Sequence, residues 1–197
     1  MKKFIAAICF TFICACVFAQ VEAFEKNLYQ DPNGFFSVLK PDGWRTSEYN
    51  ETGRGKVKFI HPANDKIKVI IIGEPNPYSS FNELVEASKN SDQRMKEKYQ
   101  SYDVSVTSET FTADNIQYTK SIMTLKKMDI KQLLVDFILK NMHFSFSYAA
   151  PISSFDAYVP KIFESVFSLI PSNREFTDQE IKNALVTSKI KQAQYNL

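Results

Sequence analysis

Cysteine is confined to the first 16 residues of this 197-residue chain, at Cys9, Cys14 and Cys16. The rest of the chain contains no thiol. This excludes a disulfide, a thiolate nucleophile and a cysteine metal site from the part that follows.

Histidine and glycine are also scarce. The two histidines, His61 and His143, form no HExxH pattern, and we expect both to be ordinary surface or half-buried residues. The five glycines form neither a phosphate-binding loop nor a G-x-S-x-G nucleophile turn. The sequence therefore predicts no catalytic residue, no cofactor and no metal ion.

The chain has no large excess of either charge, with 24 basic and 22 acidic residues. Loss of Lys2 and Lys3 with the N-terminal segment would leave 22 of each, and hence a formal charge of zero. Nucleic-acid binding needs a strong basic excess, so we expect no nucleic-acid partner.

The N-terminus has the pattern of an export signal. Lys2 and Lys3 precede a run at 4–18 that is apolar except for Thr11, and Ala19 offers a cleavage site. This run is too short for a permanent membrane span. We predict a signal peptide at 1–19 and a periplasmic or extracellular protein. Alternatively, "ICAC" at 13–16 is similar to a lipobox, in which Cys16 would be lipidated and would tether the protein to a membrane.

Alternating apolar residues predict strands before and after one helix. The segments 55–62 and 66–75 form a hairpin around 62–65, with Val57, Phe59, Ile67, Val69 and Ile71 on one face. Ser80 and Glu83 have capping-box spacing and open a helix that ends near Tyr99.

The second half reads as four strands and a final helix. Strands are predicted at 104–112, 116–126, 130–139 and 142–149, with tight turns at 114–115 and 140–141. Ser154 is the expected cap of a helix whose apolar stripe comprises Phe155, Tyr158, Val159, Ile162, Phe163 and Val166. Strands joined by short turns pair antiparallel, so the fold class is α+β. A second capping box at Thr177 and Glu180 predicts a polar helical tail at 171–197.

Two stretches resemble the PsbP-like superfamily, which includes PsbP and exported DcrB-like proteins. They are "YQDPNGFFSVLKPDGW" at 29–44 and "HFSFSYAAPISSFDAYVPKIFESVFSLI" at 143–170, the latter with the late serine Ser168. The resemblance implies an antiparallel sheet flanked by helices at 24–170, and an accessory or unassigned role. Because its motifs concern packing, it implies little about chemistry.

In the first stretch, Gly34 permits a turn, and Pro41 and Gly43 are expected to end an edge strand. Trp44 is expected to close one end of the core. The alternative is an exposed tryptophan that stacks on a ligand.

Four lysines form the candidate binding site. Lys56 and Lys58 share one parity on their strand, as do Lys66 and Lys68 on the next, so the hairpin would gather all four on one face. This face could dock an anionic partner. Alternatively, it is a solvated face whose lysines discourage edge-to-edge pairing.

Asp136, within the apolar run "LLVDFIL", has three interpretations: a tuned acid, a partner for a lysine such as Lys120, or a carboxylate that faces water. We favour the last two, because a lone carboxylate rarely catalyses without a second group.

These observations predict an exported, non-catalytic binding or accessory module that contacts an unknown envelope protein or component. It would touch a membrane only through a lipid on Cys16. Two alternatives remain: a carrier of small apolar ligands in a cleft between sheet and helix, or a hydrolase assembled from scattered residues.

Overall fold

The computed structural model describes residues 27–48 and 53–172. The strands are β1 (Leu28–Gln30), β2 (Phe36–Leu39), β3 (Arg45–Glu48), β4 (Gly55–Ile60), β5 (Lys68–Pro75), β6 (Val104–Ala113), β7 (Ile116–Leu125), β8 (Ile130–Leu139), β9 (Met142–Ala150) and β10 (Ile170–Pro171). The helices are α2 (Phe81–Lys98) and α3 (Ile152–Phe167), with short 3-10 turns η1 (Gln100–Tyr102) and η2 (Lys126–Met128). The predicted signal peptide, Cys16 and most of the predicted tail lie outside the described residues.

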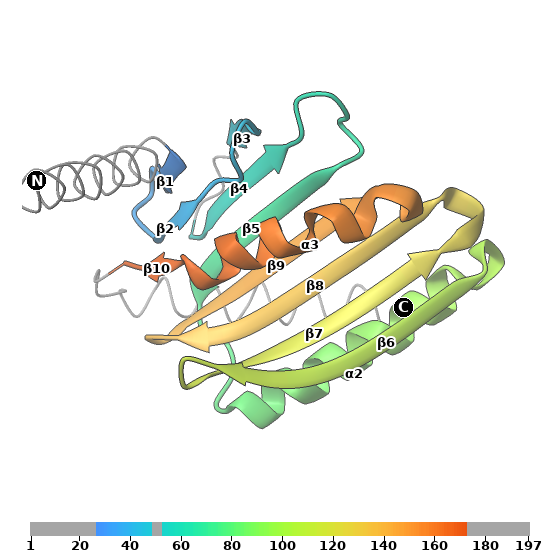
Figure 1. The fold of residues 1–197 in the computed structure, drawn as a ribbon. Helices are drawn as coiled ribbons and strands as arrows, with labels where there is room; N and C mark the ends of the chain where they lie inside the picture. Colours follow the sequence, from blue (N-terminus) through green and yellow to red (C-terminus); the bar gives the residue numbers. More distant parts are fainter. Residues whose placement is uncertain (1–26, 49–52, 173–197) are drawn as a thin grey trace, which may run out of the picture.

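Most of the strands form one large antiparallel sheet in the order β3-β4-β5-β9-β8-β7-β6 (Figure 1). The predicted hairpin is confirmed as β4 and β5, and the predicted four-strand run is confirmed as the meander β6 to β9. The tight turns after β6 and β8 have the positive φ angles that asparagine and aspartate tolerate, at Asp114, Asn115 and Asn141. Antiparallel strands and separate helices confirm the α+β class.

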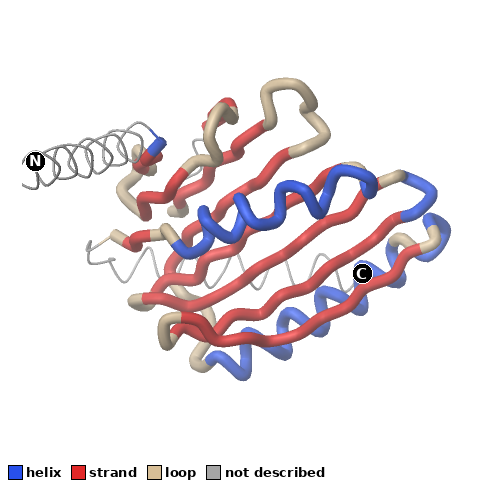
Figure 2. The backbone as a smooth tube through the Cα atoms, viewed as in Figure 1, coloured by secondary structure: helices blue, strands red, loops and turns tan. Residues whose placement is uncertain are grey.

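The two helices lie on opposite faces of this sheet (Figures 1 and 2). Helix α3 packs on β8, β9 and β2, and its predicted stripe is confirmed, with Phe155, Ile162 and Val166 fully buried. Beneath it the alternating residues of β9 point inward. Phe144, Phe146 and Tyr148 are all completely buried. The Tyr148 hydroxyl donates to the Phe155 carbonyl at 3.0 Å, which satisfies a polar group inside the core.

Helix α2 covers β6, β7 and β8 on the other face. The capping box is confirmed in part: Ser80 Oγ accepts from the Glu83 amide at 3.3 Å, but the Glu83 carboxylate accepts from the Ser79 amide at 2.8 Å, not from Ser80. Farther along, Asp92 is buried and its Oδ2 accepts from Ser121 at 2.8 Å and from Ser108. These bonds attach the helix to β6 and β7.

A small sheet, ordered β1-β2-β10, closes one end of the core. The prediction that β2 is an edge strand was wrong, because β1 and β10 pair with it on both sides. Strand β10 comes from the far end of the chain, so no local pattern around β2 indicates it. The late serine also joins these segments: Ser168 Oγ accepts from the Leu39 amide at 2.9 Å.

The small sheet approaches β4 and β5 at two glycines that face each other across the strands. A Cβ at Gly73 would lie 2.8 Å from the rings of Phe36 and Phe144, and one at Gly55 would lie 2.8 Å from Phe36. The pair therefore forms the slot that Phe36 fills. No local turn requires these glycines, so the sequence did not predict their role.

Two predictions about individual residues have clear outcomes. Trp44 is buried, at 3 % exposed, against His61 and Tyr158, which confirms the core position and overturns the ligand-stacking alternative. Ser154 is not the cap of α3, because the helix already begins at Ile152. The Ile152 amide instead donates to Asp129 Oδ1 at 3.2 Å, a capping contact from a distant turn.

Candidate functional site

The structure places three of the four candidate lysines on one strand face and the fourth in a turn. Lys56, Lys58 and Lys68 share the sheet face away from α3, as strand parity predicts, but Lys66 lies in the turn before β5 and not on the strand. There the Lys66 amide donates to Asn64 Oδ1 at 3.0 Å. The prediction that all four project from one strand face was therefore wrong for Lys66.

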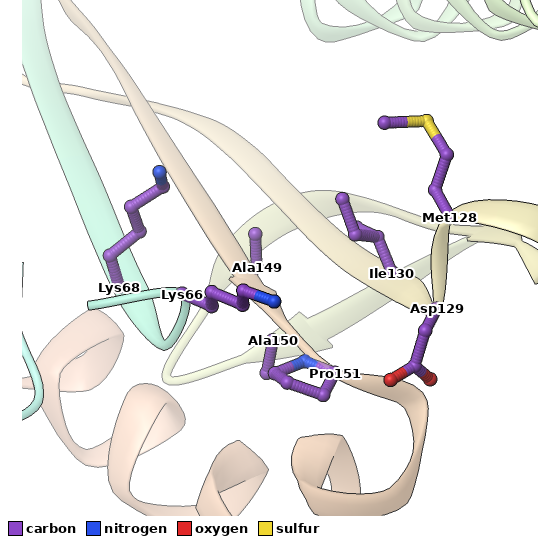
Figure 3. A pocket seen from close by; sticks show the side chains of 8 residues that line it. All are labelled: Lys66, Lys68, Met128, Asp129, Ile130, Ala149, Ala150 and Pro151. Carbon is purple, nitrogen blue, oxygen red and sulfur yellow. The ribbon is translucent and has the colours of Figure 1, made fainter. Parts of the chain in front are cut away.

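Lys66 and Lys68 line a cavity of about 210 Å³ at one end of the large sheet. The cavity is bordered by the turn before β5, the end of η2, the start of β8 and the end of β9; its lining residues are Lys66, Lys68, Met128, Asp129, Ile130, Ala149, Ala150 and Pro151. Figure 3 shows Lys68, Ala149 and Ile130 projecting to the same side, away from α3. We call this cavity the lysine pocket.

The lysine pocket combines two positive charges with an apolar wall. Within the described part of the chain, neither Lys66 nor Lys68 has an acidic or hydrogen-bonding partner for its ammonium group. Met128 is 43 % exposed although it is a large apolar residue, and Ile130 and Ala149 continue the wall from Met128. A pocket of this kind can hold an anionic group and an apolar group together.

Among the described residues that line the lysine pocket, Asp129 is the only acid. Its carboxylate turns toward the start of α3, where Oδ1 accepts from the Ile152 amide (Figure 3). Its φ angle is 53°, a left-handed conformation that aspartate and asparagine adopt more readily than other residues with a side chain. Asp129 thus holds α3 in place, and its charge lies on the side of the pocket away from Lys68.

A second group of charges, which we call the His143 cluster, lies on the same sheet face at the other end of β5, β8 and β9. His143 Nδ1 is 3.3 Å from Glu74 Oε1, and Nε2 is 3.3 Å from Asp136 Oδ1. Arg54 Nη1 lies 4.0 Å from the other oxygen of Glu74. Two carboxylates are thus matched by Arg54 and a protonated imidazole.

The two carboxylates keep His143 charged. Burial by itself lowers the pKa of an imidazole, but hydrogen bonding and charge attraction from Asp136 and Glu74 outweigh it and raise the pKa to about 9. Both ring nitrogens face carboxylates, which is the arrangement that a doubly protonated ring requires. At neutral pH this ring is therefore an imidazolium, which can donate protons but cannot act as a general base.

The His143 cluster also holds the segment that leads into α2. The ring of Tyr78 meets that of His143 edge-on, with centroids 5.2 Å apart. Burial, with the negative charges of Asp136, Glu74 and Glu83, raises the pKa of the Tyr78 hydroxyl to about 12. Asn76 fixes the loop, because its side chain donates to the Tyr78 carbonyl at 2.7 Å and accepts from the Tyr78 amide at 3.1 Å.

These contacts correct the expectations for Asp136 and His143. Asp136 is buried, at 7 % exposed, so it does not face water; Lys120 binds Glu109 instead, at 2.6 Å. The true partner, His143, is also buried at 7 %, not a surface or half-buried residue. His61 is half-buried, as predicted, and contacts the Tyr158 hydroxyl at 3.1 Å. No sequence pattern indicates the cluster, because Glu74, Asp136 and His143 come from three different strands, Arg54 comes from the loop before β4, and they meet only in the folded sheet.

Among the described residues, no three histidine or acidic side chains are placed to hold a metal ion. In the His143 cluster the reason is visible: Glu74 and Asp136 contact opposite nitrogens of the ring, so the three groups do not converge on one point. None of the described helices is both long enough and apolar enough to cross a bilayer.

Comparisons with known proteins concern the fold. No protein-family model matches the sequence. No curated protein matches it either. The structure is similar to the solution structure of cyanobacterial PsbP (CyanoP) from Synechocystis sp. PCC 6803, with a TM-score of 0.55 and 13 % identity over 73 % of this chain and 91 % of that one. A crystal structure from Bacteroides thetaiotaomicron VPI-5482 matches at a TM-score of 0.39 and 18 % identity, over 76 % of this chain and about half (48 %) of that one.

The likeness to CyanoP rests on arrangement and not on shared residues, since the identity is low. It agrees with the resemblance found at 29–44 and 143–170, whose residues form the small sheet, β9 and α3. The chain has a PsbP-like α+β fold.

Proposed function

We propose that this protein is an exported, non-catalytic accessory module of the cell envelope that binds an anionic partner through Lys66 and Lys68. The observation that carries the proposal is the lysine pocket, where two neighbouring ammonium groups have no partner among the described residues. Charges that a protein leaves unpaired on a concave surface are available to a ligand or partner. Export is supported by the signal pattern at 1–19.

The accessory role is also consistent with the PsbP-like fold, because the resemblance implies accessory proteins. Two features of the described residues favour binding over catalysis. In the His143 cluster, His143 and Asp136 are buried and the imidazole is held as a cation, so this pair offers a substrate neither easy access nor a base. The surface between sheet and α3 is filled by Phe155, Ile162 and Val166, which leaves a carrier little room along that buried contact.

The experiment that tests the proposal compares complexes recovered from the native envelope. The full chain and a Lys66→Glu/Lys68→Glu variant are expressed in the source cells, purified gently and measured by native mass spectrometry. We expect a partner to co-purify with the wild-type chain and to be lost in the variant, because charge reversal turns attraction into repulsion.

The matched control is Lys96→Glu/Lys161→Glu, which makes the same change in net charge at exposed positions on α2 and α3. We expect this control to keep the partner. Equal loss in both variants would mean that only overall charge matters, and retention in both would overturn the proposal. The same spectra give the mass of the mature chain, which separates cleavage after Ala19 from lipidation at Cys16.

A further inference from the structure

We propose that the lysine pocket binds a short amphiphilic anion, that is, a carboxylate or phosphate carried on a short apolar chain. This inference rests on the proposed function and specifies which anion the same site selects. The two charges alone would accept any anion. The selectivity comes from what lies beside them.

The wall of the pocket opposite the lysines is apolar. Ile130 and Ala149 project into the pocket from β8 and β9, and Pro151 borders it at the start of α3. Met128 stands at the rim with 43 % of its surface exposed, and it precedes Asp129 in the turn between β7 and β8. Methionine is unbranched and adapts its shape to apolar ligands. An inorganic anion would leave this wall in contact with water.

The charges around the pocket fix the orientation of the ligand. Lys68 projects from β5 on one side of the pocket, and Asp129 lies on the side of η2 and β8. An anionic group is attracted by Lys66 and Lys68 and repelled by Asp129, so it lies toward β5. The apolar chain of the ligand then lies toward Ile130 and Met128. These two apolar residues flank Asp129 in the sequence and contact the uncharged part of the ligand.

The volume of the pocket limits the size of the ligand. A cavity of about 210 Å³ is smaller than the roughly 300–1,000 Å³ of a typical drug-sized ligand site. It therefore admits a head group and a short chain, not a whole lipid or a folded peptide segment. A free amphiphilic acid and the head group of a lipid both present an anionic group next to an apolar chain. The pocket would accept either one, so an experiment has to separate these two sources.

The test is a titration of the full mature chain, followed by the backbone amide NMR signals of Ile130, Ala149 and Ala150. The probes are acetate, butyrate and hexanoate, with hexyl phosphate as a second anion and hexanol as the uncharged match. We expect affinity to rise about fourfold for each added methylene until the wall is covered, which is the gain for a buried CH₂. Hexanol should bind at least tenfold more weakly than hexanoate.

Variants of the pocket test each part. Lys66→Met and Lys68→Met, which keep the apolar stem, should each lower hexanoate affinity about threefold to fivefold. Met128→Gln should reduce the gain in affinity for each added methylene, because it places a polar group at the rim of the pocket. Asp129→Asn keeps both the left-handed conformation and the acceptor for the Ile152 amide, and should raise hexanoate affinity about twofold.

Vesicles of phosphatidylglycerol, compared with phosphatidylcholine, separate the two sources. Binding to phosphatidylglycerol that depends on Lys66 and Lys68 and is displaced by hexanoate would identify a lipid head group as the source. Binding of hexanoate without vesicle binding would identify a free or protein-borne anion. Either result supports the pocket.

A flat chain-length series in the wild-type chain would overturn the inference. If the envelope partner is nevertheless lost in Lys66→Glu/Lys68→Glu, the proposed function stands without this ligand class. If hexanoate binds as expected but the envelope partner is kept, the pocket stands and the proposed function fails. The two failures are therefore distinguishable.

Discussion

The lysine pocket and the His143 cluster lie at opposite ends of β5 on one face of the same sheet. They differ in whether their charged side chains have partners of opposite charge. Lys68 begins β5 and Glu74 lies near its end. In the His143 cluster, the buried His143 and the half-buried Arg54 match the charges of Asp136 and Glu74. In the lysine pocket, two ammonium groups have no partner among the described residues and lie beside an open cavity.

The difference follows from the cost of removing a charge from water. A buried charge without a partner costs several kcal/mol, so interior charges must be paired. A charge at a concave surface keeps most of its hydration and can remain unpaired at little cost. The paired charges thus support a structural role for the His143 cluster, and the unpaired charges beside a cavity are the basis of the binding that we propose for the lysine pocket.

The largest effect is expected from breaking the His143 cluster. His143→Leu leaves two carboxylates at the same place without their shared cation. We expect the free energy of unfolding to fall by about 3–5 kcal/mol at pH 7, which is the usual cost of removing one partner from a buried ion pair. Urea unfolding followed by circular dichroism measures this change.

The matched control is the double variant His143→Leu/Asp136→Val, which removes both charges and leaves Glu74 its contact with Arg54. It should lose clearly less stability than the single variant, because replacing a buried pair by apolar groups is often nearly neutral. A single variant as stable as the wild type would show that the His143 cluster does not stabilise the fold.

A smaller effect is expected from pH. The pKa of His143 is about 9 in the folded protein and 6.5 when unperturbed. A raised pKa contributes stability that is complete below about pH 6.5 and is lost as the pH rises through 9. From this shift we expect wild-type stability to fall by about 3 kcal/mol over that window.

Thermal or urea unfolding at pH 6, 7.5 and 9.5 measures this slope. The appropriate reference is His143→Leu, in which the same series should be nearly flat apart from groups that both chains share. Parallel slopes in the two proteins would contradict the assignment of the pH dependence to His143.

The smallest effect on stability is expected at the lysine pocket. Lys66→Met/Lys68→Met removes two charges that have no partner in the described residues, so we expect the free energy of unfolding to change by less than about 0.5 kcal/mol. Binding of hexanoate should nevertheless be largely lost in the same protein. A stability loss near that of His143→Leu would mean that these lysines have a structural role and would remove the contrast between the two regions.

Much of the fold could be predicted from the sequence, because the signals were local. Alternation at 142–149, the turn residues at 114–115 and 140–141, and the apolar stripe of α3 each depend on neighbours a few residues apart. The boundaries of the meander agree with the prediction to within about one residue. The central position of β2 could not be predicted, because β10 reaches it from more than a hundred residues away.

The candidate site was predicted only in part. Lys66 and Lys68 stand out by their parity on the hairpin, but the wall that turns them into a pocket comes from η2, β8 and β9. Likewise, Asp136 is unusual within an apolar run, but its partner His143 was predicted to be an ordinary surface or half-buried residue. Register places Ile138 and not Asp136 opposite His143, so the contact is diagonal and no spacing in the sequence indicates it.

The sequence by itself determined the α+β class, the order of the elements from β4 to α3 and the apolar faces of β4, β5, β9 and α3, since these depend on periodicity and turn chemistry. Only the tertiary structure decided which charged side chains have a partner of opposite charge and which have none among the described residues. Strand pairing brings together side chains that lie far apart in the chain, and the depth at which they meet decides whether a charge needs a partner.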